Sequence, residues 1–266
     1  MKLSIVLSTQ PASFSALAYT GSIEENLAKI KNFGFDGVEL AIRDPNELDF
    51  PEIENLLKSN DLVVPAIGTG QAYGEDGLSF THSDTTIRQQ TVERIISHMQ
   101  IAEKLNAVVI IGLIRGQNIT GMGKELAERW LIDALRNCAS ENKNVKLAIE
   151  PINRYEIDFL NNVTESLQFL DRLNMENVGL LLDTFHMNIE EPSIPESILA
   201  ARERLFHVHV ADSNRWYPGA GHIDFQEVIQ TLDTLGYHNF LSGEILPLPD
   251  PDSSAKKMIE FFRKIL

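Results

Sequence analysis

The chain has 266 residues, of which 43% are hydrophobic and 23% charged, an ordinary globular composition. Its 38 acidic and 23 basic residues leave a net charge of −15, and such a field repels nucleic acid and anionic membranes, so neither is expected as a partner. No apolar run approaches the roughly 20 residues of a membrane span, and the N-terminus lacks a full signal-peptide core. The single cysteine, Cys138, excludes an internal disulfide and suits a reducing cytoplasm, where we expect the protein.

Short apolar runs alternate with amphipathic segments along the whole chain. The runs are typical of strands buried on both faces, and they lie at 3–8, 37–42, 62–68, 107–112, 145–150, 178–183, 205–210 and 240–245. The segments between them predict helices near 22–33, 50–60, 84–105, 122–143, 163–173, 194–202, 223–236 and 253–265. Ser22 followed by Glu25 resembles a capping box for the first helix, and Thr164 is the expected cap of the helix at 163–173.

Eight strands in strict alternation with eight helices favour an α/β fold, a single (β/α)₈ TIM barrel that spans residues 1–266 as one domain. No Pro/Ser-rich linker divides the chain. An open, doubly wound sheet is the alternative, and it is disfavoured because no GxGxxG motif follows the first strand. In a barrel of this type the active site lies at the C-terminal ends of the strands.

Three carboxylates and one imidazole end consecutive apolar runs, and they are Glu150, Asp183, His209 and Glu244. At one barrel mouth their like charges would conflict, and a divalent cation removes the conflict. Three oxygen ligands and one nitrogen suit one hard metal ion, Mn²⁺ first, with Mg²⁺ or Co²⁺ as alternatives and Zn²⁺ still open. His207 shares a strand face with His209, and we interpret it as a hydrogen-bonded core residue.

A family resemblance is carried by EPINRYE from Glu150, by LLDTFHMNIEE around Asp183, by HVHVADSNRWYPGAGHIDF from His207 and by the late Glu244. These segments resemble the ketose 3-epimerases of the D-tagatose and D-psicose 3-epimerase type, which belong to the xylose-isomerase-like barrels, and the resemblance covers essentially the whole chain. It implies that the four strand-end residues bind the metal and that the two glutamates also act as the acid/base pair. It further implies a dimer or tetramer, and substrate contacts from Glu156, His186 and Arg215.

This residue set suits the inversion of a carbon next to a ketone. A proton must leave one face of that carbon and another must return on the opposite face, through an enediolate. A metal stabilises the enediolate charge as a Lewis acid, and two carboxylates on opposite sides of the sugar, Glu150 and Glu244, can transfer the two protons. The expected partner is therefore a small keto-sugar or keto-sugar acid.

Three further polar residues are expected at the rim: Arg43 in AIRD, Gln71 in AIGTGQAYG and Arg115 in IIGLIRGQ. The two arginines would suit a negatively charged group on the substrate. The alternative is that Arg43 pairs with Asp44 or Asp36 and that Arg115 pairs with a nearby acid. The segments MKLSIVLST, AIGTGQAY and IIGLIRG resemble 5-keto-L-gluconate epimerases, which implies a keto-sugar acid converted to D-tagaturonate.

Several other functions stay open. A free-ketose 3-epimerase acting on tagatose, psicose or ribulose would use the same metal and carboxylates. An aldose–ketose or hydroxypyruvate isomerase would pass through the same enediol and return the proton elsewhere. An endonuclease acting on abasic DNA would need several zinc ions and more histidine ligands. It is disfavoured because the chain has only seven histidines and a net charge of −15. A non-catalytic sugar-binding protein would have no reason to keep a complete acid/base pair.

Overall fold

The computed structural model describes residues 1–117 and 123–266. Eight parallel strands pair in chain order, and the last pairs with the first, so the sheet closes into a barrel. The strands are β1 (Lys2–Ser8), β2 (Glu39–Ala41), β3 (Ala66–Gly68), β4 (Val108–Ile111), β5 (Leu147–Ile149), β6 (Val178–Asp183), β7 (Leu205–His209) and β8 (Phe240–Gly243). The predicted (β/α)₈ barrel is confirmed, and the open sheet is excluded.

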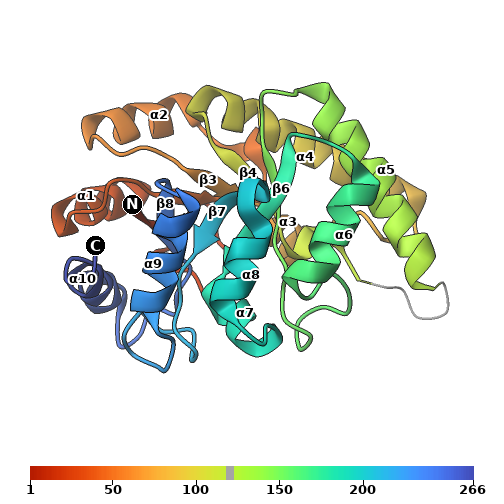
Figure 1. Ribbon diagram of the computed structural model, residues 1–266. Coiled ribbons are helices and arrows are strands. Elements are labelled where there is room, and N and C mark those ends of the chain that lie inside the picture. The colour runs from red at the N-terminus through yellow and green to blue at the C-terminus, as the bar shows by residue number, and fades with distance from the viewer. Residues whose placement is uncertain (118–122) are drawn as a thin grey trace.

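Helices surround the barrel, as Figure 1 shows. Those between strands are α1 (Ile23–Phe33), α2 (Phe50–Ser59), α4 (Thr85–Leu105), α5 (Lys124–Glu141), α6 (Val163–Leu173), α8 (Ile194–Ala201) and α9 (Phe225–Leu235), and α10 (Pro251–Phe262) follows β8. Single 3₁₀ turns are η1 (Pro45–Glu47), η2 (Leu113–Arg115) and η3 (Arg202–Arg204). The predicted helix start at residue 122 lies outside the described residues. Lys29 of α1 pairs with Asp252 of α10 at 3.4 Å, so the first and last helices meet.

Two short helices at the mouth escaped prediction: α3 (Gly70–Asp76) follows β3, and α7 (Thr184–Glu190) follows β6. Each has only seven residues, too few for a 3.6-residue period to stand out from a loop. They matter because α3 carries Gln71 and α7 carries His186 to the end of the barrel where the strands finish.

Six of the eight strands are shorter than the apolar runs that predicted them, whereas β1 is one residue longer and β6 matches its run. The run at 62–68 contributes only three residues to β3, because Pro65 has no backbone N–H for the ladder. Val63 instead forms an isolated bridge with Gly37. The hydrogen-bonded part of the barrel is therefore short along the strand direction, and the segments that follow the strands form most of the mouth.

Of the two predicted helix N-caps, one is present in the structure and the other is not. Ser22 caps α1, and its hydroxyl accepts from the amide of Glu25 at 3.3 Å, as predicted. Thr164 does not cap α6, so that prediction is wrong. The N-cap is Asn162, whose extended backbone lets its side-chain oxygen accept from the amide of Glu165 at 2.9 Å, and Thr164 already lies inside the helix.

The core lies in the barrel and between the barrel and its helices. Each of these helices buries an apolar stripe, as α6 does with Val163, Phe169, Leu170 and Leu173. Burial of such stripes, at about 25 cal/mol per Å² of apolar surface, is the main force that holds the helices on the strands. Among the described residues, none of the helices combines the length and the apolar character that crossing a membrane requires.

Candidate functional site

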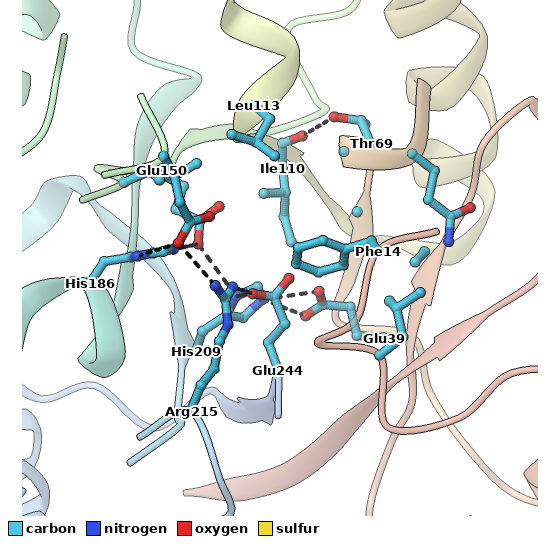
Figure 2. A pocket seen from close by; sticks show the side chains of 18 residues that line it. Phe14, Glu39, Thr69, Ile110, Leu113, Glu150, His186, His209, Arg215 and Glu244 are labelled. Carbon is cyan, nitrogen blue, oxygen red and sulfur yellow. Dashed lines mark hydrogen bonds and ion pairs between the residues drawn. The ribbon is translucent and has the colours of Figure 1, made fainter. Parts of the chain in front are cut away.

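A pocket opens at the carboxyl ends of the strands. Figure 2 shows its two unlike sides, one lined by charged groups and one by apolar ones. The charged side consists of Glu39, Glu150, Glu156, His186, His209, Arg215 and Glu244. The apolar side includes Phe14, Ile110 and Leu113.

The structure brings the four predicted strand-end residues together. Glu150 directly follows β5, Asp183 ends β6, His209 ends β7 and Glu244 directly follows β8. One ligand atom from each lies within 4.8 Å of all the others. All four side chains are withdrawn from solvent, and the most exposed, that of Glu244, keeps only 15% of its surface accessible.

Three atoms of this group suit a divalent cation. Glu150 Oε1, Asp183 Oδ2 and His209 Nδ1 are buried and find no hydrogen-bond partner within residues 1–117 and 123–266. A buried polar atom without a partner costs about 1–3 kcal/mol. His209 Nδ1 lies 3.7 Å from Glu150 Oε1 and 3.9 Å from Glu244 Oε2, so these lone pairs gather around one point. Three carboxylates and an imidazole form a donor set for a hard divalent ion.

Glu39 on β2 is a site residue that the sequence analysis missed. Its carboxylate is 1% exposed and accepts hydrogen bonds from the ring nitrogens of His207 and His209. The signal was present in the run GVELAI, because a carboxylate inside a buried strand needs a partner. The interpretation of His207 as a hydrogen-bonded core residue agrees with its position.

Arg215 is the cation of the cavity. Its guanidinium donates to Glu244 Oε2 at 2.8 Å and to Glu156 Oε1 at 3.2 Å. The residue has a φ of 61°, an uncommon backbone conformation for a side chain other than glycine or asparagine. Its carbonyl accepts from the amide of Leu246, which ties the loop after β7 to the loop after β8.

His186 is oriented by Asn153, which was not among the residues predicted to contact the substrate. The amide nitrogen of Asn153 lies 2.8 Å from His186 Nδ1 and donates to Glu156 Oε1 at 2.8 Å. Because an amide nitrogen only donates, Nδ1 accepts and the ring proton sits on Nε2. That nitrogen lies 3.8 Å from both Glu150 Oε1 and Asp183 Oδ2, so it points an N–H toward the candidate metal group.

The two glutamates that were predicted as the acid/base pair have separated pKa values. Burial, together with the charges of Glu150 and Asp183, raises the pKa of Glu244 to about 7, against the opposing effect of His209 and Arg215. Burial also acts to raise the pKa of Glu150, but His209, His186 and Arg215 outweigh it and leave that pKa below its usual value. The surroundings of the two carboxyl groups therefore shift their pKa values in opposite directions, as is typical of acid/base pairs.

Arg115 lies away from the cavity lining. Its side chain is 0% exposed, and it donates to the backbone carbonyls of Glu150 at 2.7 Å and Leu160 at 3.2 Å. Burial lowers the pKa of Arg115 to about 10, so it stays charged at neutral pH. The expectation of a rim arginine facing a substrate carboxylate does not fit this position. The 3₁₀ turn η2 turns the side chain inward, where it supports the strand end that carries Glu150.

Arg43 also lies outside the cavity lining, since it is held by a carboxylate. Its Nε donates to Asp76 Oδ1 at 2.9 Å, and Arg94 binds the other oxygen of Asp76 at 2.9 Å. The alternative of an ion pair therefore holds, although the partner is neither Asp44 nor Asp36. The unpredicted helix α3 places Asp76 beside Arg43.

Gln71 is brought to the cavity, as expected. It is 4% exposed, and its Nε2 donates to the hydroxyl of Ser8, which in turn donates to the carbonyl of Gln10. This chain fixes the orientation of the amide. Its oxygen, Oε1, is buried and has no hydrogen-bond partner among the described residues, so it is available as an acceptor.

Fold and site together define a (β/α)₈ barrel with a buried acid–imidazole group at its mouth. The chain belongs to the xylose isomerase-like TIM barrel family, whose model matches residues 27–265. An L-ribulose 3-epimerase of Mesorhizobium japonicum is 28% identical over 95% of this chain and 85% of its own length. An L-ribulose 3-epimerase of Methylomonas sp. (strain DH-1) is 30% identical over 79% of this chain and 74% of its own.

The solved structures show the same likeness. A D-allulose 3-epimerase from Methylomonas sp. in complex with D-allulose superposes with a TM-score of 0.84 at 25% identity and covers 100% of this chain and 98% of that one. The resemblance to ketose 3-epimerases that the motifs indicated is thereby confirmed. The prediction of an isomerase of the carbohydrate epimerase type agrees with these relatives.

Proposed function

We propose that this protein is a divalent-metal-dependent epimerase that inverts the carbon next to the ketone of a keto-sugar. The observation that carries the proposal is the convergence of Glu150, Asp183, His209 and Glu244 within 4.8 Å at the cavity. The names of the relatives, which are ketose epimerases, support the same reaction class.

The four residues would hold one metal ion, for which Mn²⁺ is the first candidate and Mg²⁺ or Co²⁺ the alternatives, because their oxygen-rich donor set is hard. When bound, the ion supplies Lewis-acid stabilisation of the negative charge that develops on the substrate oxygens.

The chain's own residues perform the proton transfers. Glu150, whose pKa lies below its usual value, removes the proton from one face of the carbon. Glu244, which faces the cavity from the end of β8, delivers a proton to the other face. In the reverse direction the two residues exchange roles.

Three neighbours orient the substrate oxygens. The Nε2–H of His186 and the guanidinium of Arg215 are donors that face the charge of the enediolate. Glu156 accepts from Arg215 and is 31% exposed at its side chain, so it can also accept from a sugar hydroxyl. On the far side, the free oxygen of Gln71 accepts from another hydroxyl, and the apolar side chains exclude water.

The finer proposal is a keto-sugar acid of the 5-keto-L-gluconate to D-tagaturonate type, and it rests on the sequence segments that carry that resemblance. The alternative is a free-ketose 3-epimerase acting on tagatose, psicose or ribulose. It is supported by the names of the relatives, and by Arg43 and Arg115 lying away from the cavity lining. If the substrate is an acid, Arg215 is the cation that lines the cavity among the described residues and can meet its charge.

The test is incubation of metal-loaded protein in D₂O with two panels, followed by NMR. One panel holds 5-keto-L-gluconate and D-tagaturonate, and the other holds D-tagatose, D-fructose and L-ribulose. Epimer formation with deuterium beside the ketone is expected, and the faster panel identifies the substrate class. An aldose product would show an isomerase instead. Absence of exchange with every sugar, although metal is bound, would contradict the proposal.

A further inference from the structure

Glu39 is a charged side chain placed deep in the barrel on β2, whereas the four proposed metal ligands come from the ends of β5 to β8. It lies on β2, and its side chain is 1% exposed. Burial of a lone carboxylate is costly unless hydrogen bonds compensate it. The residues that compensate Glu39 come from β7, on the other side of the barrel interior.

Both oxygens of Glu39 face histidine nitrogens. His209 Nε2 lies 3.0 Å from Oε1 and 3.0 Å from Oε2, and His207 Nε2 lies 2.9 Å from Oε2. The two rings meet edge to face, with centroids 5.4 Å apart and an interplanar angle of 80°. They can share one carboxylate because residues two apart in a strand face the same way. Figure 2 shows the carboxylate of Glu39 beside His209.

These contacts determine which nitrogen of His209 carries the proton. An ionised carboxylate only accepts, so Nε2 of His209 must be the donor. The lone pair of the neutral ring is then at Nδ1, the atom that has no hydrogen-bond partner among the described residues. Nδ1 is also the atom that lies 3.7 Å from Glu150 and 3.9 Å from Glu244, at the centre of the proposed metal group.

We infer that Glu39 is a positioning residue of the proposed metal centre. It holds the ring of His209 in place and keeps its proton on Nε2, so that Nδ1 presents its lone pair to the metal, and His207 holds Glu39. The inference rests on the proposed function, since it requires that the four residues bind a metal. Hydrogen bonds to the outer nitrogen of a metal-binding imidazole typically change metal affinity 10- to 100-fold.

The variant that tests this is Glu39→Gln, which keeps the shape and replaces one oxygen by a donor. A glutamine cannot accept from both histidines with two oxygens, so one ring loses its partner or its tautomer. The matched control is Glu227→Gln, the same substitution on the exposed surface of α9. Dissociation constants for Mn²⁺ are measured for all three proteins by titration calorimetry, with far-UV circular dichroism as a check of folding.

We expect Glu39→Gln to bind Mn²⁺ about 10- to 100-fold more weakly than the parent, and Glu227→Gln to bind it as tightly as the parent. At saturating Mn²⁺ the KM of Glu39→Gln for the sugar should match that of the parent. An unchanged dissociation constant for Glu39→Gln would overturn the inference and leave the proposed function standing. If, in that case, the KM for the sugar is also raised, Glu39 contacts the sugar and does not position the metal centre. A parent protein that binds no metal would instead overturn the proposed metal centre itself.

A second measurement applies if Glu39→Gln does not fold. The parent protein, labelled with ¹⁵N-histidine and loaded with diamagnetic Mg²⁺, is studied by NMR. The inference predicts that the proton of His209 is attached to Nε2 and exchanges slowly with water. A proton on Nδ1 would overturn it.

Discussion

The two sides of the cavity differ in polarity and in charge (Figure 2). On the side of β5 to β8, ionisable groups contact one another, and several of their buried atoms still have no hydrogen-bond partner among the described residues. On the side of β1 to β4, apolar side chains such as Phe14 and Leu113 line the wall, and Gln71 contributes a single free acceptor. The difference indicates that the charged side carries out proton transfer and that the apolar side binds the carbon chain of the substrate.

This division has a physical reason. Oriented charges and dipoles act more strongly where water is excluded, so the apolar side strengthens the electrostatic effect of the charged side. Glu39 belongs by position to the strands of the apolar side, yet its carboxylate faces His209 and joins the charged group. Experiments on the two sides should therefore change different kinetic quantities.

The largest effect is expected on the charged side. Glu244→Gln removes a carboxylate that is both an acid/base group and a proposed metal ligand, so kcat measured at saturating Mn²⁺ should fall about 10²- to 10⁴-fold with little change in KM. Steady-state kinetics on the best sugar of the panels measure this. The control is Glu227→Gln on the exposed surface of α9, which should behave as the parent. A kcat within twofold of the parent would contradict the acid/base assignment.

Removal of the metal should act almost as strongly. Lewis-acid stabilisation amounts to several kcal/mol, which corresponds to about 10³-fold in rate, so dialysis against a chelator should reduce turnover to that extent. Addition of Mn²⁺ should restore it, and Mg²⁺ or Co²⁺ should restore it in part. Full turnover by protein whose measured metal content is far below one ion per chain would refute the metal requirement.

The apolar side should respond in binding rather than in turnover. Leu113→Ala shortens a side chain that lines the cavity, and the lost contact of roughly 1–2 kcal/mol should raise KM about 5- to 30-fold while kcat changes little. Kinetics on the same sugar provide the comparison with Glu244→Gln. If Leu113→Ala lowers kcat instead, the apolar side contributes to proton transfer as well as to substrate binding.

Replacement of Arg115 should lower the free energy of unfolding more than replacement of Arg43. Arg115 donates to buried carbonyls, whereas Arg43 forms a partly exposed ion pair. Arg115→Met leaves buried carbonyls without donors, so the free energy of unfolding should fall by about 2–4 kcal/mol in urea titrations. Arg43→Met should lower it by less than about 1 kcal/mol, because that pair is partly exposed. Neither variant should change the ratio of KM values for acid and neutral sugars. A selective rise for the acids would show that one arginine reaches the substrate.

The smallest effect concerns the acid dependence of stability near α3. Burial opposes ionisation of Asp76, but Arg43 and Arg94 outweigh it and lower its pKa from 3.8. Because the folded pKa lies below the unfolded one, this stabilisation is complete above the unfolded pKa and is lost as the pH falls through the folded pKa. Asp76→Asn should therefore have a lower unfolding midpoint than the parent at neutral pH, and the difference should shrink in acid. A difference that does not depend on pH would contradict the ion-pair origin.

Much of the fold followed from local patterns. Strands buried on both faces have continuous apolar runs, and amphipathic helices have a 3.6-residue period, so their alternation indicated the barrel. The short helices α3 and α7 have too few residues to show a period, and Pro65 shortened a strand that its apolar neighbours made look longer. The cap at Asn162 was missed because Thr164, two residues later, satisfies the same preference for a polar cap.

The sequence by itself determined the barrel and the four groups at its strand ends, because the strands of a barrel are parallel and their ends must meet at one mouth. Only the tertiary structure decided what distant residues do to one another. It turned Arg115 inward to the carbonyl of Glu150, paired Arg43 with Asp76, and set Glu39 against His209, which is 170 positions away in the chain. Such contacts depend on side-chain direction and burial across the fold, and no local period or spacing encodes them.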